Sequence, residues 1–381
     1  MNLSTRSESL SESGIRKFFE LAEARDDVIS LGVGEPDFSA PWAARNAAIE
    51  ALEQGRTSYT ANRGMAELRE SVADHHHRYD QRYAPDQEMM ITAGASEALD
   101  LAFRALVDPS DVVAIHEPTY ISYAPAAGLS GGQLLSVETR PEDEFRLTRE
   151  TLQEAGAEQA DYLMLCYPNN PTGAVMTDEG LAEVAAFCRE NNIEVIADEI
   201  YAALTYGQDH ASIATQPGMR ERTVVVNGFS KAYAMTGLRL GYAMGPAEVI
   251  DAMNRIHQYT LLSAPTTAQH AAVEALASCE DALQEMRSEY DRRRTYVLSR
   301  FREMGLEPFE AKGAFYAFPH CGGDDERFAQ ELLDEEGVAV VPGSVFGAGG
   351  DGHLRVSYAT GMNELRTALD RIESFVSSGA V

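Results

Sequence analysis

The chain has 381 residues, of which 44% are hydrophobic and 24% are charged, a composition typical of a core-forming globular protein rather than a disordered or fibrous one. Its 60 acidic residues against 31 Lys plus Arg give a net charge of -29. Nucleic acid and anionic membranes are therefore poor partners, because binding phosphates needs clustered positive charge.

The middle of the chain predicts alternating strands and helices. Short apolar, β-rich runs predict strands at 87–92, 111–116, 161–167, 193–198, 223–227 and 239–244. Helical spacing of apolar residues predicts one helix around Leu99, Ala102, Phe103 and Leu106, and another around Leu181, Val184, Ala185 and Cys188. We therefore expect an α/β fold: a mainly parallel sheet with helices on both faces and ligands at the carboxyl ends of the strands.

After about Glu285 the pattern changes. A long charged helix at roughly 284–304, with Arg292–Arg294 as a solvated face, leads into shorter strands at 312–318, 337–341 and 353–358. This pattern predicts a smaller α+β domain. We divide the chain into an N-terminal arm with part of the small domain (1–41), a large domain (42–285) and a small C-terminal domain (286–381).

The stretch Asn227-Gly-Phe-Ser-Lys231 directly follows a hydrophobic strand. A lysine at a strand end can be partly desolvated, which lowers its pKa towards an amine that forms a Schiff base. An isolated lysine is more often an ordinary surface residue, but lysine is scarce in this chain. Eight residues later, Arg239 offers a fixed positive charge that suits a phosphate.

Three further segments follow predicted strands. Asp198 ends the strand in Val195-Ile-Ala-Asp-Glu-Ile-Tyr201, and an aspartate there is costly unless it meets a cation, such as a protonated ring nitrogen. Cys166-Tyr-Pro-Asn-Asn-Pro-Thr-Gly173 reads on its own as a turn. Ala93-Gly-Ala-Ser-Glu97 opens a helix whose N-terminus presents free N–H groups to an anion, although alone this signal is weak.

Together these pieces resemble the class I/II aminotransferases, which are fold-type I pyridoxal 5′-phosphate (PLP) enzymes. The resemblance runs from Leu31-Gly-Val-Gly-Glu-Pro-Asp-Phe38 to His353-Leu-Arg-Val-Ser-Tyr358, and it is closest to the archaeal and bacterial subgroup of aspartate or aromatic aminotransferases. The ordered occurrence of NNPTG, ADEIY, SK and LRVSYA is highly specific.

The resemblance implies a role for each matching position. Lys231 would bind the cofactor covalently and later move the proton at the substrate Cα, and Asp198 would hold the pyridine nitrogen protonated. Further residues would contact the cofactor ring: Asn170 and Tyr201 at the phenolate oxygen, and Tyr120 by stacking. The phosphate would be held by Ala95, Ser96, Ser230 and Arg239, with Tyr59 reaching across from a second subunit of a homodimer. The substrate would meet Gly34, Asn170 and Arg355, the last gripping the α-carboxylate by a two-pronged contact.

Some positions depart from the family pattern. Gly228 stands where many relatives carry Ser, which makes Ser230 a less certain phosphate ligand. Gln258-Tyr-Thr260 lacks the Arg of animal-type dicarboxylate specialists, and Ser96 stands where a bacterial aspartate subgroup uses Lys. The absence of this Arg and of this Lys argues against a strict preference for aspartate.

The resemblance implies a ping-pong aminotransferase that moves the amino group of an aromatic amino acid or aspartate to a 2-oxo acid, chiefly 2-oxoglutarate. Two alternatives remain. A PLP-dependent carbon–sulfur β-lyase shares Lys231, Asp198 and Arg355. A non-enzymatic PLP sensor fused to a DNA-binding domain is opposed by the absence of such a domain before residue 31 and by the acidic charge.

Several other signals carry no function in our interpretation. Adjacent residues on a helix point about 100° apart, so His75-His-His77 cannot converge on a metal and is expected to be solvated. The segment Phe346-Gly-Ala-Gly-Gly-Asp-Gly352 precedes a strand, whereas a dinucleotide fingerprint follows one, so we expect a loop. Cys166 is expected to be a core residue, and no metal site is expected.

The basic residues are three Lys (Lys17, Lys231 and Lys312) against 28 Arg. An acidic chain almost without Lys is typical of a halophilic, cytoplasmic protein, since high salt screens the repulsion; a merely acidic protein is the less favoured alternative. The four cysteines lie far apart without a C-x-x-C pair, which fits a reducing compartment. The first residues lack the apolar stretch of a signal peptide, and no segment is as long as a membrane span.

Overall fold

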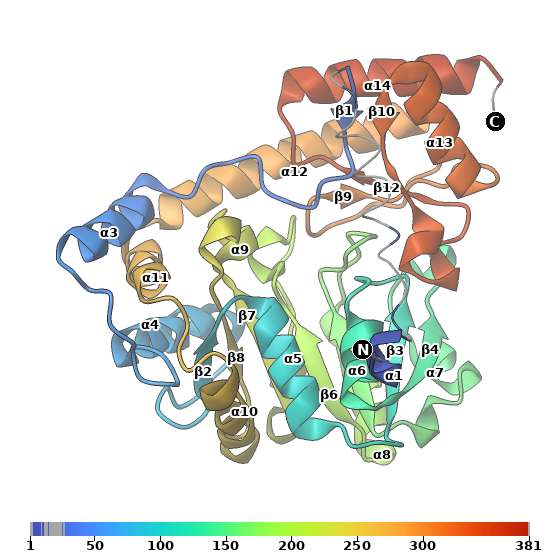
Figure 1. Cartoon of the computed structure of the whole chain (residues 1–381). Helices are drawn as coiled ribbons and strands as arrows, with labels where there is room; N and C mark the ends of the chain where they lie inside the picture. Colours follow the sequence, from blue (N-terminus) through green and yellow to red (C-terminus); the bar gives the residue numbers. More distant parts are fainter. Residues whose placement is uncertain (1–2, 9, 11–13, 15–24, 26, 380–381) are drawn as a thin grey trace.

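The computed structural model describes residues 3–8, 10, 14, 25 and 27–379, so part of the predicted arm 1–41 lies outside the described residues. Its largest sheet among these residues has seven strands in the order β2-β8-β7-β6-β5-β3-β4 (Figure 1). The strands are β2 Met89–Thr92, β3 Val112–Glu117, β4 Gln133–Glu138, β5 Tyr162–Cys166, β6 Glu194–Asp198, β7 Thr223–Gly228 and β8 Gly241–Met244. Only β8 runs antiparallel to its neighbours β2 and β7, so the sheet is mainly parallel.

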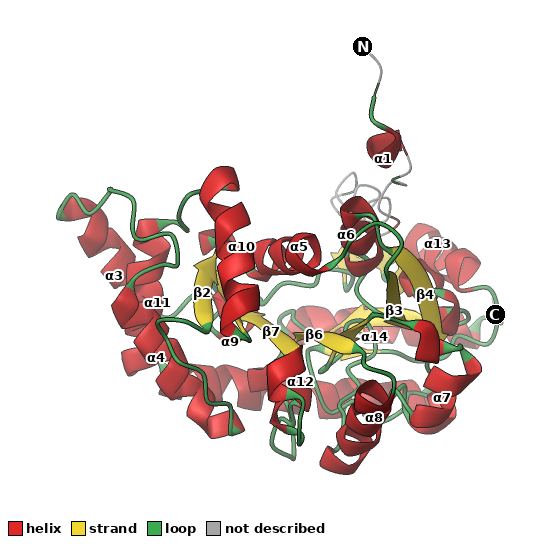
Figure 2. Ribbon diagram, turned by 90° about the horizontal axis from the view of Figure 1, so that it is seen from below, coloured by secondary structure: helices red, strands yellow, loops and turns green. Residues whose placement is uncertain are grey.

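Helices cover both faces of this sheet (Figure 2). On one face lie α5 (Ala95–Leu106), α6 (Tyr123–Ser130) and α10 (Ala247–Thr260), whose apolar side chains form one buried cluster with the strands. On the other face lie α7 (Arg149–Glu154) and α8 (Asp178–Glu190), which belong to a second cluster. The sheet is therefore buried on both sides, which explains why β5, β6 and β7 read as continuous apolar runs.

The remaining helices surround this core and build the second part of the molecule. Their bounds are α1 Thr5–Glu8, α3 Trp42–Glu53, α4 Ala66–His76, α9 Phe229–Ala232, α11 Thr266–Ser278, α12 Glu280–Glu303, α13 Asp325–Glu336 and α14 Met362–Ser377. The long helix α12 runs from beside α11 towards α14 (Figure 1). Within the described residues, no helix is long and apolar enough to cross a membrane.

Two small sheets lie near α13 and α14. The strands β11 (Val341–Pro342), β12 (Leu354–Ser357) and β9 (Tyr316–Ala317) are antiparallel. The strand β1 (Ile29–Ser30) pairs in parallel with β10 (Val338–Ala339). The chain before α3 therefore joins the C-terminal part of the molecule.

The predicted fold class is confirmed. All six strands predicted between 87 and 244 occur with small shifts at their ends, and Leu181, Val184, Ala185 and Cys188 are buried along one side of α8. The strand β4 was not predicted, because it lies at the edge of the sheet and buries only Val137, so its apolar pattern is weak.

Two predictions of solvated side chains are wrong. His76 is fully buried, with Nε2 2.7 Å from the Tyr242 hydroxyl and Nδ1 in contact with Gln81. Arg293 is also buried, since its guanidinium lies 2.9 Å from the Asp37 carboxylate and 2.8 Å from Glu289. Both side chains face the core from their helices and are stabilised there by polar partners. Cys166 is buried, as predicted.

Candidate active site

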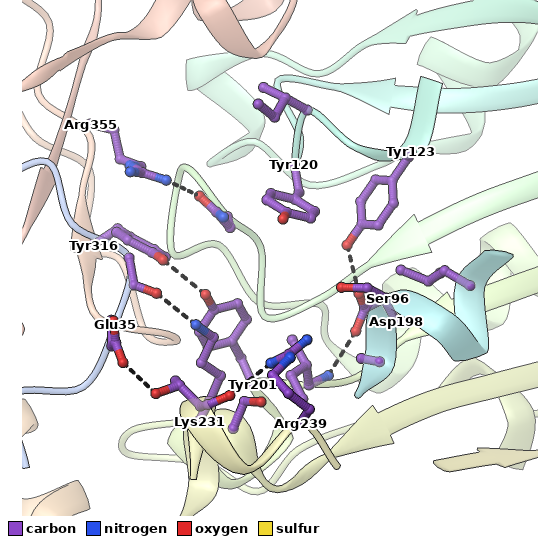
Figure 3. A pocket seen from close by; sticks show the side chains of 18 residues that line it. Glu35, Ser96, Tyr120, Tyr123, Asp198, Tyr201, Lys231, Arg239, Tyr316 and Arg355 are labelled. Atoms are coloured by element: carbon purple, nitrogen blue, oxygen red, sulfur yellow. Dashed lines mark hydrogen bonds between the residues drawn. The ribbon is translucent and has the colours of Figure 1, made fainter. Parts of the chain in front are cut away.

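A cavity of about 450 Å³ opens beyond the carboxyl ends of β5, β6 and β7, facing the small antiparallel sheet (Figure 3). The residues singled out from the sequence line it, with the exception of Tyr59: Gly34, Ala95, Ser96, Tyr120, Asn170, Asp198, Tyr201, Ser230, Lys231, Arg239 and Arg355. Tyr59 is 77% exposed and lies outside the cavity of its own chain. The cavity therefore brings together side chains from across the sequence.

Lys231 lies on the short helix α9, directly after β7. Its Nζ donates a hydrogen bond to the Gly34 carbonyl oxygen at 2.6 Å. Burial lowers the pKa of Lys231 to about 8, with the nearby Glu35 carboxylate acting in the opposite direction. A lysine with such a pKa is neutral in a substantial fraction of molecules near neutral pH, which makes it a nucleophilic amine.

Asp198 ends β6 and is buried. Its Oδ2 accepts a hydrogen bond from the Tyr123 hydroxyl at 2.9 Å, and its Oδ1 accepts one from the Ile200 N–H at 3.0 Å. Burial raises the pKa of Asp198 to about 6, although both hydrogen bonds oppose this shift. A buried carboxylate at the cavity wall is suited to holding a protonated nitrogen of a ligand.

Arg355 lies on β12 and is also buried. Its Nη1 donates to Asn170 Oδ1 at 2.9 Å, its Nη2 donates to the Gly32 carbonyl oxygen, and its Nε has no hydrogen-bond partner. The guanidinium lies 4.8 Å from the Tyr316 ring centroid and 5.0 Å from that of Phe346. Among the described residues, no carboxylate forms an ion pair with it. A buried cation in this state is suited to an anionic ligand, and its planar fork matches the shape of a carboxylate.

A second anion site lies where α5 begins. Gly94 has φ +85°, and a Cβ there would lie 2.8 Å from Arg239 Nη2, so glycine lets the guanidinium lie against the turn. Gly241 on β8 packs equally closely, because a Cβ at that position would lie 2.5 Å from the Ala95 nitrogen. The N–H groups of the first turn of α5 and the Arg239 guanidinium thus lie together, as a phosphate requires.

Four polar cavity residues were missed by the sequence analysis: Glu35, Tyr123, Thr236 and Tyr316. The Tyr316 hydroxyl lies 2.8 Å from that of Tyr201, and Glu35 accepts a hydrogen bond from Thr236. Glu35, Tyr123 and Thr236 each lie within three residues of a predicted site residue, and this spacing is their only local signal. Tyr316 has no such neighbour and reaches the cavity through tertiary packing.

Comparisons with known proteins give consistent results. The family model for aminotransferases of class I and II matches residues 26–372. An aspartate aminotransferase of Pyrococcus abyssi and aromatic-amino-acid aminotransferase 2 of Thermococcus litoralis are each 42% identical over 380 residues, which covers 98% of this chain and 98% of each relative. The crystal structure of an aromatic aminotransferase from Pyrococcus horikoshii matches with a TM-score of 0.91 and 41% identity, covering 95% of this chain and 99% of that one.

Proposed function

Because the chain belongs to the class I and II aminotransferases, a family that uses PLP, we propose that it moves the amino group of an L-amino acid to a 2-oxo acid by a ping-pong mechanism. The donors are aromatic amino acids or aspartate, and the acceptor is 2-oxoglutarate. The observation that supports this function most strongly is the convergence of Lys231, Asp198 and Arg355 on one cavity.

The residues of the cavity fit PLP. A buried amine suits the cofactor aldehyde, and the buried carboxylate of Asp198 suits a protonated pyridine nitrogen. The first turn of α5, Ser230 and Arg239 offer donors and charge for the phosphate. Tyr120 would cover the ring, with Tyr201 and Asn170 at its phenolate oxygen. These residue roles are proposals supported by the positions of the side chains around the cavity.

When bound, PLP supplies an aldehyde that accepts the amino group and a ring that withdraws electrons from the substrate. Arg355 then binds the substrate α-carboxylate through its two-pronged guanidinium and fixes the Cα–H bond relative to Lys231. The neutral Nζ of Lys231 would take the proton from the substrate Cα and, as a general acid, deliver it to the carbon of the former cofactor aldehyde. Asp198 would hold the proton on the pyridine nitrogen.

The carbon–sulfur β-lyase alternative shares this machinery, but the relatives compared above are named aminotransferases. A panel of amino donors with 2-oxoglutarate tests the proposal, with glutamate formation as the measurement. In the control reaction, cystathionine is added without a 2-oxo acid, and we expect no pyruvate. Rapid pyruvate release together with no glutamate from any donor would favour the lyase.

We also propose that the enzyme is a cytoplasmic homodimer, with the domain division 1–41, 42–285 and 286–381. Tyr59 is 77% exposed, and its loop lies beside an exposed apolar segment that contains Tyr259, Leu261 and Leu262. Two hydrogen bonds connect the loop to this region, from Asn62 Nδ2 to the Leu262 carbonyl oxygen at 2.7 Å and from Thr266 to that of Ser58 at 2.8 Å. Exposed apolar side chains around a tyrosine assigned to the neighbouring phosphate site support contact with a second subunit.

Covalent capture of PLP by the cofactor-free enzyme should accelerate as the pH rises from 7 to 9. With a Lys231 pKa of about 8, about one tenth of the amines are neutral at pH 7 and about nine tenths at pH 9. Stopped-flow absorbance in the near-visible range measures the rate. A PLP analogue that lacks the aldehyde serves as the control and should bind without this dependence. A rate that is flat over this range would contradict the assignment of Lys231 as the titrating amine.

The enzyme should need salt to stay folded and dimeric. With a net charge of -29, repulsion acts across the whole molecule at ~0.01 M salt, where the screening length is about 30 Å, but over only about 3 Å at ~1 M. This electrostatic repulsion opposes both the compact folded state and the association of two acidic subunits. Loss of the dimer would remove Tyr59 from its partner's phosphate site, so activity and PLP content should fall together.

Stepwise dialysis from molar to millimolar KCl, followed by activity, PLP content and sedimentation, tests the salt requirement. A parallel series in which a neutral solute of equal osmolality replaces KCl separates charge screening from water activity. Full activity and an intact dimer after prolonged dialysis to low salt would show that the acidity has another cause.

A further inference from the structure

A partly buried contact between Glu97 and His257 lies next to the turn that begins α5. Glu97 Oε2 accepts a hydrogen bond from the Ala93 N–H at 2.5 Å, and Oε1 lies 2.9 Å from His257 Nδ1. The His257 side chain is fully buried, and its Nε2 has no hydrogen-bond partner. Glu97 is therefore the polar partner of His257.

Glu97 does not line the cavity, whereas its neighbours Ala95 and Ser96 do. Its carboxylate instead accepts the N–H of Ala93, on the approach to the helix, and not an N–H of the first turn of α5. The Thr92 hydroxyl supports the same turn by donating to the Gly94 carbonyl oxygen at 2.9 Å. Because Gly241 and Arg239 both lie close to this turn, a small displacement would move the N–H groups of the turn relative to the Arg239 guanidinium.

We propose that Glu97 and His257 form a pair of positioning residues that holds the phosphate-binding turn in place for the cofactor. Glu97 fixes the turn through Ala93, and His257 fixes the Glu97 carboxylate from α10. This inference rests on the proposed function, because it assigns the cofactor phosphate to Ala95, Ser96 and Arg239. The pair acts through the turn and touches neither substrate nor the reacting atoms.

The test compares the full-length wild-type chain with E97A, E97Q, H257A and the E97A/H257A double variant. Asp100→Asn is the matched control, since Asp100 pairs with Arg104 at 2.9 Å on the exposed side of the same helix. After removal of the cofactor, calorimetry in one fixed salt concentration gives dissociation constants for PLP and for inorganic phosphate. Thermal unfolding without phosphate shows whether each variant is folded.

We expect E97A and H257A each to weaken the binding of both PLP and inorganic phosphate about tenfold, equivalent to about 1.4 kcal/mol. The dissociation constants of the double variant should be at most about twice those of the weaker-binding single variant, because each single change already breaks the pair. The affinities of E97Q for PLP and phosphate should lie between those of wild type and E97A, since the amide oxygen of glutamine can still accept the hydrogen bond from the Ala93 N–H. At saturating PLP, kcat and KM for the amino donor should change less than twofold.

Phosphate and PLP affinities in folded E97A and H257A that match those of D100N would overturn the proposal. A loss of PLP affinity without a loss of inorganic phosphate affinity would also overturn it, because the pair would then act elsewhere on the cofactor. Should E97A fail to fold, the comparison of E97Q and H257A with D100N decides in the same way. Failure of the proposed function is seen separately, as a wild-type enzyme that transaminates no donor.

Discussion

Replacing Lys231 with alanine is expected to abolish turnover while the protein stays folded. Among the described residues, Lys231 supplies the only side-chain amine in the cavity wall, so the substitution removes the group proposed to attach PLP and to move the Cα proton. A single acid–base group contributes about 10²–10⁴-fold to a rate, so we expect kcat to fall by at least about 10⁴-fold. The Lys231 side chain forms no part of the apolar core, so the fold should not depend on it.

Borohydride reduction followed by peptide mapping gives the direct measurement. The wild-type enzyme should carry the cofactor adduct on Lys231, together with near-visible absorbance that K231A lacks. Lys312→Ala is the matched control, because Lys312 lies outside the cavity, and it should keep both activity and absorbance. An adduct on Lys312, or on Lys17, which lies outside the described residues, would disprove the assignment.

Replacing Arg355 with alanine is expected to weaken the binding of both amino-acid and 2-oxo-acid substrates by about 2–5 kcal/mol. This corresponds to a loss of roughly 30- to 4,000-fold in kcat/KM. The buried guanidinium has no carboxylate partner among the described side chains, and its Nε is free. Its removal takes away the cation that offsets the cost of burying the substrate carboxylate. Because Arg355 is assigned to the substrate, the cofactor spectrum should barely change.

The Arg355→Lys variant separates charge from geometry. Lysine keeps the positive charge but cannot form the two-pronged contact, so the kcat/KM of R355K should lie between the values for wild type and R355A. Initial rates with several donors, and with 2-oxoglutarate as acceptor, give the measurement. A normal KM for every donor in R355A would remove Arg355 from the substrate site.

The parts of the site that lie at strand ends could be predicted from the sequence. Lys231 and Asp198 each follow a continuous apolar run, and parallel strands bring their carboxyl ends to one edge of the sheet. The same logic does not apply to Tyr316, whose hydroxyl meets that of Tyr201 although the two lie 115 residues apart. Nothing in the residues around Tyr316 indicates which distant strand it will face.

Burial of polar side chains was also difficult to predict. Arg293 was expected in solvent because it stands in a run of three arginines, but it packs against Asp37, 256 residues away in the sequence. His76 is similarly buried, and its hydrogen-bond partner Tyr242 lies 166 residues away in the sequence. A local pattern shows that a residue is polar, whereas its partner is set by the tertiary fold.

The long-range contacts of the cavity also bear on how the enzyme is made. Lys231 Nζ meets the Gly34 carbonyl oxygen 197 residues earlier in the chain, and Arg355 meets Gly32 across 323 residues. Since domains emerge from the ribosome N-terminal end first, the segment that carries Gly32 and Gly34 is synthesised long before its partner on β12. A nascent chain shorter than about 355 residues therefore lacks Arg355, the side chain proposed to bind the substrate carboxylate, whereas every residue proposed to bind PLP has been synthesised by Arg239.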